Sequence, residues 1–126
     1  MIEVELFRDE GVVVVFPVSA LTATDFAQLA TLVDPYIAER GGLNGLMIVA
    51  GHFPGWDSFE GLIGHIRFVR DHERAIARVA MVSDAISLTV LPALARHFVA
   101  AEVRHFAFEQ RDAAMAWLTS PAPRKN

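Results

Sequence analysis

Two arrangements of apolar residues along this chain predict five β-strands. Some segments alternate apolar with polar residues, as in MIEVELF, and others are short apolar blocks, such as VVVVFPV and LMIVA. The predicted strands are Met1–Arg8, Val12–Val18, Leu46–Ala50, Ala75–Ser83 and Glu102–Phe108. A tight turn at 9–11 joins the first two strands into a hairpin, and the second strand is apolar enough to lie inside the sheet.

Four further segments repeat apolar residues at helical spacing. The first helix begins behind Thr22, with Asp25 three residues later as in a capping box, and Gly41 is placed to end it. Pro35 interrupts this helix, so we expect a kink or a changed register beyond Val33. The other helices are expected at Ser58–Asp71, Ala85–Phe98 and Arg111–Thr119.

The order of these elements is ββαβαβαβα, which predicts an α/β fold. A hairpin followed by alternating strands and helices indicates a mixed, largely parallel sheet of about five strands with four covering helices. We expect one domain over residues 1–120 and a flexible tail over 121–126.

Composition excludes several classes of protein. The 126 residues include no cysteine, which excludes disulfides, thiolate catalysis and thiolate metal sites. No apolar run reaches the roughly 18 residues of a membrane helix, and a net charge of −4 without a basic cluster argues against nucleic-acid binding. We expect a cytoplasmic protein without a cofactor. A 53% apolar share is typical of a homo-oligomer such as a dimer, although a well-filled core gives the same composition.

The region from Leu46 to His72 is the best candidate for a binding site. A strand, a turn-rich loop and a helix N-terminus follow one another there, which is the arrangement that places ligands at the carboxyl end of a strand. The candidate ligand or interaction residues of this loop are His52, Phe53, Trp56, Asp57 and Ser58. The alternative is that Trp56 belongs to the core and the acids complement the helix dipole.

The expected second helix carries a second candidate surface. Gly61, Gly64 and Phe68 fall on the side opposite its apolar stripe, where they would permit close approach of another molecule. This predicts a self-association surface or a ligand groove. The alternative is that the first or third helix already covers that side.

The charged residues of the same helix give weaker signals. His65 and His72 are two turns apart, roughly 10 Å along the axis, which is too far for one metal ion, and we expect no metal site. Arg67, Arg70 and Arg74 form a modest basic patch. A solvated helix end explains the patch, and a phosphorylated partner or a lipid headgroup is the alternative.

Four groups of residues resemble the bacterial SpoIIAA-like family, a relative of the STAS domains of anti-sigma-factor antagonists with a looser likeness to Sec14-type lipid-binding lobes. The matching groups are Trp56-Asp57, Phe68 with His72, Ile76–Ala80, and Ala101–Phe106 leading to Ala116–Leu118. The resemblance extends from about Glu3 to Leu118 and implies the STAS-like fold. It implies a small cytoplasmic protein without a settled common activity.

The resemblance also implies a candidate phosphoacceptor. In phosphorylatable STAS antagonists an Asp-Ser pair opens the second helix and the serine accepts the phosphate; Asp57 and Ser58 occupy the comparable place here. The alternative is that either residue is simply a helix N-cap, for which both residue types are preferred.

These observations lead to two hypotheses for function. The first is a non-catalytic STAS-like binding or regulatory module that acts through a protein contact or self-association at helix two. The second is a carrier or sensor of a small apolar or lipid-like ligand, bound between the 51–56 loop and helix two with Phe53, Trp56 and Phe68 as walls. A small hydrolase using Ser58 or His52 has no motif in its favour, because the chain contains neither GxSxG nor a nucleotide-binding glycine motif. We expect no catalytic residues.

Overall fold

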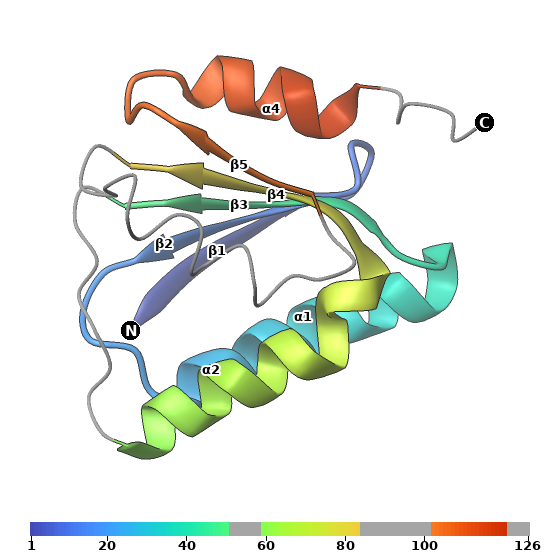
Figure 1. Cartoon of the computed structure of the whole chain (residues 1–126). Coiled ribbons are helices and arrows are strands. Elements are labelled where there is room, and N and C mark those ends of the chain that lie inside the picture. The colour runs from blue at the N-terminus through green and yellow to red at the C-terminus, as the bar shows by residue number, and fades with distance from the viewer. Residues whose placement is uncertain (51–58, 84–101, 121–126) are drawn as a thin grey trace.

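A single five-stranded sheet organises the protein, for which a computed structural model describes residues 1–50, 59–83 and 102–120. The strands are β1 (Ile2–Phe7), β2 (Val12–Pro17), β3 (Leu43–Val49), β4 (Ile76–Val82) and β5 (Glu102–Phe106). They lie side by side in sequence order, with β1 antiparallel to β2 and all later neighbours parallel (Figure 1). The predicted mixed, largely parallel sheet is thereby confirmed.

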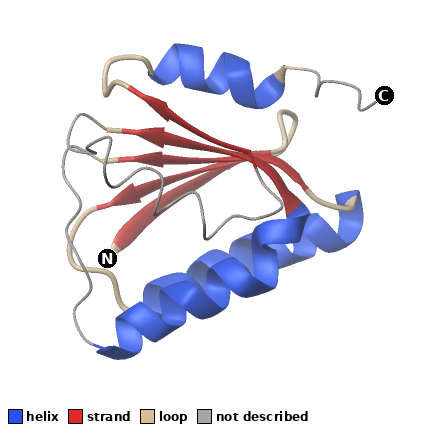
Figure 2. Ribbon diagram, viewed as in Figure 1, coloured by secondary structure: helices blue, strands red, loops and turns tan. Residues whose placement is uncertain are grey.

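Helices cover both faces of this sheet. On one face lie α1 (Ala23–Arg40) and α2 (Phe59–His72), the latter followed by a short 3-10 turn at Glu73–Ala75; α4 (Arg111–Thr119) lies on the other (Figures 1 and 2). α1 and α2 each connect two parallel strands, which cannot be joined by a tight turn. The expected helix at 85–98 and the tail at 121–126 lie outside the described residues. None of the helices within the described ranges is long and apolar enough to cross a membrane.

The sheet has an apolar layer on each face, and β2 contributes to both. Val13 and Val15 pack with residues of α1 and α2, whereas Val12 and Val14 pack with residues of α4. Successive residues of a strand point to opposite faces, so a strand covered on both sides is apolar throughout. This explains the VVVV run.

The start and end of α1 follow the sequence signals. The Thr22 hydroxyl accepts from the Asp25 N–H at 3.0 Å and the Asp25 carboxylate accepts from the Thr22 N–H at 2.9 Å, which confirms the capping box. Burial raises the pKa of Asp25, but the N-terminal ammonium, 2.9 Å away, and the bonds with Thr22 hold that pKa below its usual value. The helix ends at Gly41 in the left-handed conformation, with φ at 86°.

Of the kink or changed register predicted beyond Val33, the change of register is not found. α1 continues through Pro35 to Arg40, and its buried side stays on one face along the whole helix. Packing against the sheet and α2 outweighs the loss of one backbone hydrogen bond at the proline. The buried apolar residues of α1 are Phe26, Leu29, Val33 and Tyr36.

β3 begins at Leu43, three residues before the predicted start at Leu46. Leu43 pairs with Ile76 of β4, and Gly45 pairs with Arg78. The ladder therefore includes residues 43–45, where a glycine is more typical of a loop than of a strand. Gly45 has a packing role in this strand. A Cβ on Gly45 would lie 2.7 Å from a methyl carbon of Leu118, so α4 sits close to the sheet only because this residue has no side chain.

β5 ends at Phe106, two residues before the predicted end at Phe108. The N–H of Ala107 donates to the side-chain oxygen of Gln110 at 2.9 Å, and the Gln110 N–H donates back to the Ala107 carbonyl at 2.9 Å. This turn leads the chain directly into α4.

Candidate functional site

The carboxyl ends of β3, β4 and β5 meet at one edge of the sheet, where the sequence placed a binding site. The Ala50 N–H donates to the Val82 carbonyl at 3.0 Å, and the Ser83 N–H donates to the Phe106 carbonyl at 3.1 Å. His105 contributes one more contact, from its Nε2 to the Ser83 carbonyl. The edge is therefore a row of strand ends held together by main-chain hydrogen bonds.

The loop residues expected at this edge lie outside the described residues. They are His52, Phe53, Trp56, Asp57 and Ser58. A ligand site or a phosphoacceptor among them stays a prediction, and what the structure adds is that α2 begins at Phe59, the residue after Ser58.

The described part of the second candidate surface, Gly64 and Phe68, faces α1 of the same chain. A Cβ built on Gly64 would lie 3.1 Å from the Cα of Ala23, and Phe68 is only 7% exposed, with its ring 6.3 Å from that of Phe26. The expectation that Gly64 and Phe68 point outward is wrong, because α1 occupies that side; the alternative of a covering helix is the one found. The side chains of Phe59 to Ile63 lie outside the described set, so the structure says nothing of the surroundings of Gly61.

Stacked rings join α1 and α2 along this seam. His65 stacks on Phe26 with ring centres 4.9 Å apart, and Phe68 stacks on His72 at 4.1 Å. His72 is 8% exposed and its ring nitrogens lie 2.8 Å from the Phe68 carbonyl oxygen and 2.6 Å from the Asp34 carboxylate. His65 and His72 therefore belong to the packing between the helices.

The outer side of α2 is charged. Arg67, Arg70 and Asp71 are exposed there, and Arg74 is exposed in the 3-10 turn that follows. Arg70 pairs with its neighbour Asp71 at 3.2 Å, whereas none of the ion pairs between described residues involves Arg67 or Arg74. The side of helix two that faces solvent is a basic strip, which we define as Arg67, Arg70 and Arg74.

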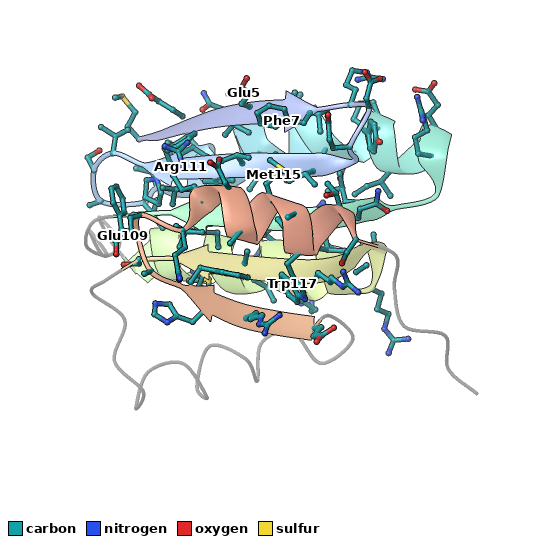
Figure 3. The ribbon with its side chains drawn as sticks, turned by 90° about the horizontal axis from the view of Figure 1, so that it is seen from above. Glu5, Phe7, Glu109, Arg111, Met115 and Trp117 are labelled. Carbon is teal, nitrogen blue, oxygen red and sulfur yellow. The ribbon has the colours of Figure 1, made fainter. Side chains whose placement is uncertain are left out.

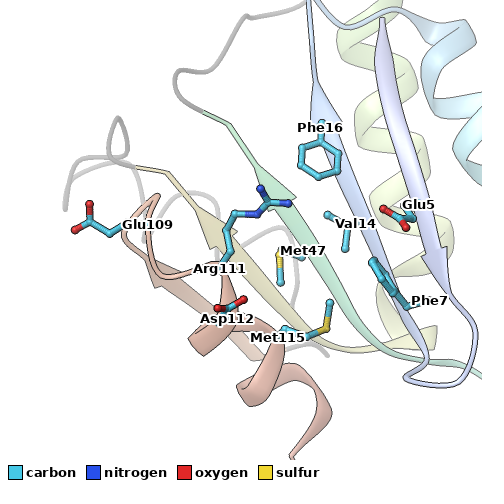
Figure 4. Close-up of a pocket in the computed structure, with 9 residues that line it drawn as sticks. All are labelled: Glu5, Phe7, Val14, Phe16, Met47, Glu109, Arg111, Asp112 and Met115. Carbon is cyan, nitrogen blue, oxygen red and sulfur yellow. The ribbon is translucent and has the colours of Figure 1, made fainter.

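A second feature is a hollow on the other face of the sheet. Within the described residues, α4 packs over β3, β4 and β5 and shares a buried cluster with Val12 and Val14 of β2, and a hollow lies beside the helix toward β1 (Figure 3). The hollow there has a volume of about 420 Å³, within the range of roughly 300–1,000 Å³ typical of small-molecule sites. Its lining residues are Glu5, Phe7, Val14, Phe16, Met47, Glu109, Arg111, Asp112 and Met115 (Figure 4).

The lining divides into an apolar floor and a charged rim. Val14 and Met47 are buried at 3% and 2% exposure and form the base, with the half-buried rings of Phe7 and Phe16 beside them. The guanidinium of Arg111 lies over the Phe16 ring, 5.1 Å from its centre. The rim carries three acids and this one cation.

Sequence reasoning missed the hollow, although part of its signal was present. The alternation in MIEVELF places Glu3, Glu5 and Phe7 on one side of β1, and acids beside an aromatic residue on a sheet face are a visible pattern. The contribution of α4 was not visible, because nothing in the local pattern tells which strands a terminal helix covers.

The comparisons with known proteins agree with this architecture. An uncharacterized protein of the DUF3478 family from Shewanella loihica PV-4, whose crystal structure has a SpoIIAA-like fold, matches 94% of this chain and 92% of its own with a TM-score of 0.64 at 22% identity. No curated protein matches the sequence. The family model described as SpoIIAA-like matches residues 12–119. This match spans β2 to α4 and therefore most of the sheet, so the chain belongs to the SpoIIAA-like family.

Proposed function

We propose that this chain is a non-catalytic binding module of the STAS type, which acts in the cytoplasm by presenting the outer side of α2 to a partner protein. The observation that carries the proposal is the basic strip, with Arg67 and Arg70 exposed on α2 and Arg74 exposed in the 3-10 turn after it, while the other side of α2 packs on α1 and the sheet. Only Arg70 in the strip has an ion-pair partner among the described residues.

The charge of the strip favours an acidic partner over a second copy of the chain. Like charges brought together across an interface cost free energy, so an antiparallel pairing of two α2 strips is opposed. The strip contrasts with the net charge of −4 of the whole chain, and such a local contrast orients an incoming acidic surface.

Charge reversal tests this proposal with a matched control. The double variant Arg67→Glu/Arg74→Glu is compared with Arg8→Glu/Arg40→Glu. The control changes the net charge equally, at two arginines that lie over the Tyr36 ring, and also breaks the exposed Arg8–Glu39 ion pair. Each is expressed in native cells, and proteins cross-linked to it are quantified by mass spectrometry. We expect the strip variant to lose a partner that wild type and control retain, and increasing salt to weaken the same contact. Equal partner sets in both variants would contradict the proposal.

Self-association is the other outcome that this pair of variants can detect. Light scattering gives the mass of the wild-type protein and of both variants. Wild type and control could both be dimers while Arg67→Glu/Arg74→Glu is a monomer. That result would assign the strip to a homodimer contact and would contradict the proposal of a different partner protein.

Phosphorylation of Ser58 is an optional switch for this module. Ser58 immediately precedes the first residue of α2, and a phosphate there would add a charge of about −2 at the N-terminal end of the helix that carries the strip. Mass spectrometry of protein from its native cell, over growth and stress conditions, tests the switch. Ser58 without phosphate under all of them would remove it.

The second hypothesis, a small apolar or lipid-like ligand between the 51–56 loop and α2, receives less support. Of its candidate walls Phe53, Trp56 and Phe68, the first two lie outside the described residues and the third packs on Phe26. The described contacts therefore favour a protein partner at α2.

A further inference from the structure

We infer that the hollow between β1, β2 and α4 is a second binding site, distinct from the strip on α2, and that it takes a small organic cation: an ammonium group on an alkyl or aryl body. α2, which carries Arg67 and Arg70 of the strip, and α4 lie on opposite faces of the sheet (Figure 1). The inference does not depend on the function proposed for the strip.

The floor of the hollow selects an apolar body. Val14 and Met47 close the base, and Phe7, Phe16 and Met115 remain only half-buried around it. An alkyl chain or ring laid on this floor would remove further apolar surface from water, at about 25 cal/mol per Å².

The rim selects a positive head group. The lining includes three acids, Glu5, Glu109 and Asp112, and one cation, Arg111, and none of the four makes an ion pair or a side-chain hydrogen bond with another described residue. Figure 4 shows the Glu109 carboxylate pointing away from the hollow, which leaves Glu5 and Asp112 as the acids beside it. The carboxylates of Glu5 and Asp112, which have no ion-pair partner among the described residues, outnumber the single guanidinium, and this excess of negative charge complements a cation.

Glu5 and Phe7 are the best placed to hold the head group. They stand two residues apart on β1 and so share its face toward the hollow, opposite Arg111 and Asp112 from α4 (Figure 4). An ammonium beside them would meet a carboxylate and the face of an aromatic ring together. The Phe16 ring already carries a cation, Arg111, whereas the Phe7 ring has no such contact with a described residue.

Three probes with the same body separate the contribution of charge from that of apolar burial. n-Octylammonium, n-octanol and n-octanoate are titrated into the full chain at pH 7 by calorimetry, below their aggregation concentrations, and the contacted residues are mapped by NMR. We expect octylammonium to bind about tenfold more tightly than octanol, from one exposed ion pair and one cation–π contact, and octanoate to bind most weakly. The NMR changes are expected at Phe7, Val14 and Met115.

Variants locate the charge that is recognised. Glu5→Gln is expected to weaken the binding of octylammonium about threefold and to leave the binding of octanol unchanged. Phe7→Leu is expected to act in the same direction, because it keeps the apolar surface and removes the aromatic ring. Glu3→Gln is the matched control, since Glu3 lies on the same strand and side but does not line the hollow. Arg111→Gln is expected to strengthen octylammonium binding by removing a like charge.

Several results would overturn the inference. They are equal affinities for the three probes, tightest binding of octanoate, binding mapped away from the hollow, the same loss in Glu3→Gln as in Glu5→Gln, and no saturable binding at all. Thermal unfolding of each variant verifies that its fold is intact, and the exposed positions of Glu3, Glu5 and Arg111 make a folding failure unexpected.

Discussion

The imidazole of His72, the last residue of α2, lies 2.6 Å from the carboxylate of Asp34 on α1. Its other ring nitrogen lies 2.8 Å from the Phe68 carbonyl oxygen, so the ring sits between two hydrogen-bond acceptors. The first contact crosses from α2 to α1, and the second lies within α2. This residue therefore ties the end of one helix to the middle of another.

Replacing His72 by Phe tests this tie. The new ring can still stack on Phe68 but makes neither hydrogen bond, so the free energy of unfolding is expected to fall by about 1–2 kcal/mol in urea denaturation followed by circular dichroism. Arg70→Gln is the control, because it breaks only the exposed pair with Asp71 and is expected to cost less than about 0.5 kcal/mol. Equal losses in the two variants would contradict a special role for His72.

The orientation of α2 predicts opposite outcomes for two adjacent residues. Phe68→Ala removes a buried ring and is expected to cost about 3–5 kcal/mol of unfolding free energy. Arg67→Ala, on the outer side, is expected to change it by less than about 0.5 kcal/mol. Chemical denaturation of both variants is the measurement. A small effect of Phe68→Ala would mean that this ring faces solvent or another molecule after all.

The close approach of α4 to the sheet predicts coupling between Gly45 and Leu118. Gly45→Ala places a Cβ 2.7 Å from a Leu118 methyl carbon and is expected to destabilise the protein by about 1–3 kcal/mol through overpacking. Leu118→Ala removes that methyl group and the carbon that bears it, 3.0 Å away, but keeps the Leu118 Cβ at 2.9 Å, so it relieves part of the overpacking; it costs about 2–5 kcal/mol by itself. In a double-mutant cycle, the unfolding free energies lost in the two single variants are expected to add up to more than the unfolding free energy lost in the double variant. Strict additivity would show that the helix does not rest on Gly45.

The lowered pKa of Asp25 predicts a stability difference that depends on pH. A carboxyl group whose pKa is lower in the folded chain stabilises the fold above its unfolded pKa, and the contribution is lost as pH falls through the folded value. Asp25→Asn is therefore expected to be less stable than wild type at pH 7. The difference in unfolding free energy between the two proteins is expected to become smaller below about pH 4.

Urea denaturation at pH 7, 5, 4 and 3 measures this difference in unfolding free energy. Asp9→Asn, an exposed acid in the β1–β2 turn, is the control and is expected to show no such narrowing. A gap between wild type and Asp25→Asn that stays constant down to pH 3 would mean that the charge of Asp25 contributes nothing beyond its hydrogen bonds.

Local sequence signals were enough to predict the elements that depend only on neighbouring residues. Thr22 and Asp25 identify the start of α1, and Gly41 identifies its end, because a cap is formed by residues within one turn of each other. The hairpin of β1 and β2 was predictable for the same reason. β3 was predicted too short, since Gly45 reads as a loop residue unless the position of Leu118 is known.

The candidate surfaces depended on contacts between distant residues, and here the sequence was a weaker guide. The periodicity of α2 places Val69 and Phe68 on different sides of the helix, but both residues are buried. The reason is that α1 and the sheet together cover more of the helix surface than its apolar stripe occupies. The hollow depends on which strands α4 covers, a matter of packing between segments about a hundred residues apart.

The sequence by itself determined the family, the order of the described strands and helices and the caps of α1, since these follow from patterns a few residues long. Only the tertiary structure decided which side of α2 meets solvent, why Gly45 is a glycine, and that a hollow forms beside α4 within the described residues. The physical reason is that each of these is an outcome of competition for the same surface by segments that lie far apart in the chain. A periodic pattern records that a residue is apolar, but not which neighbour covers it.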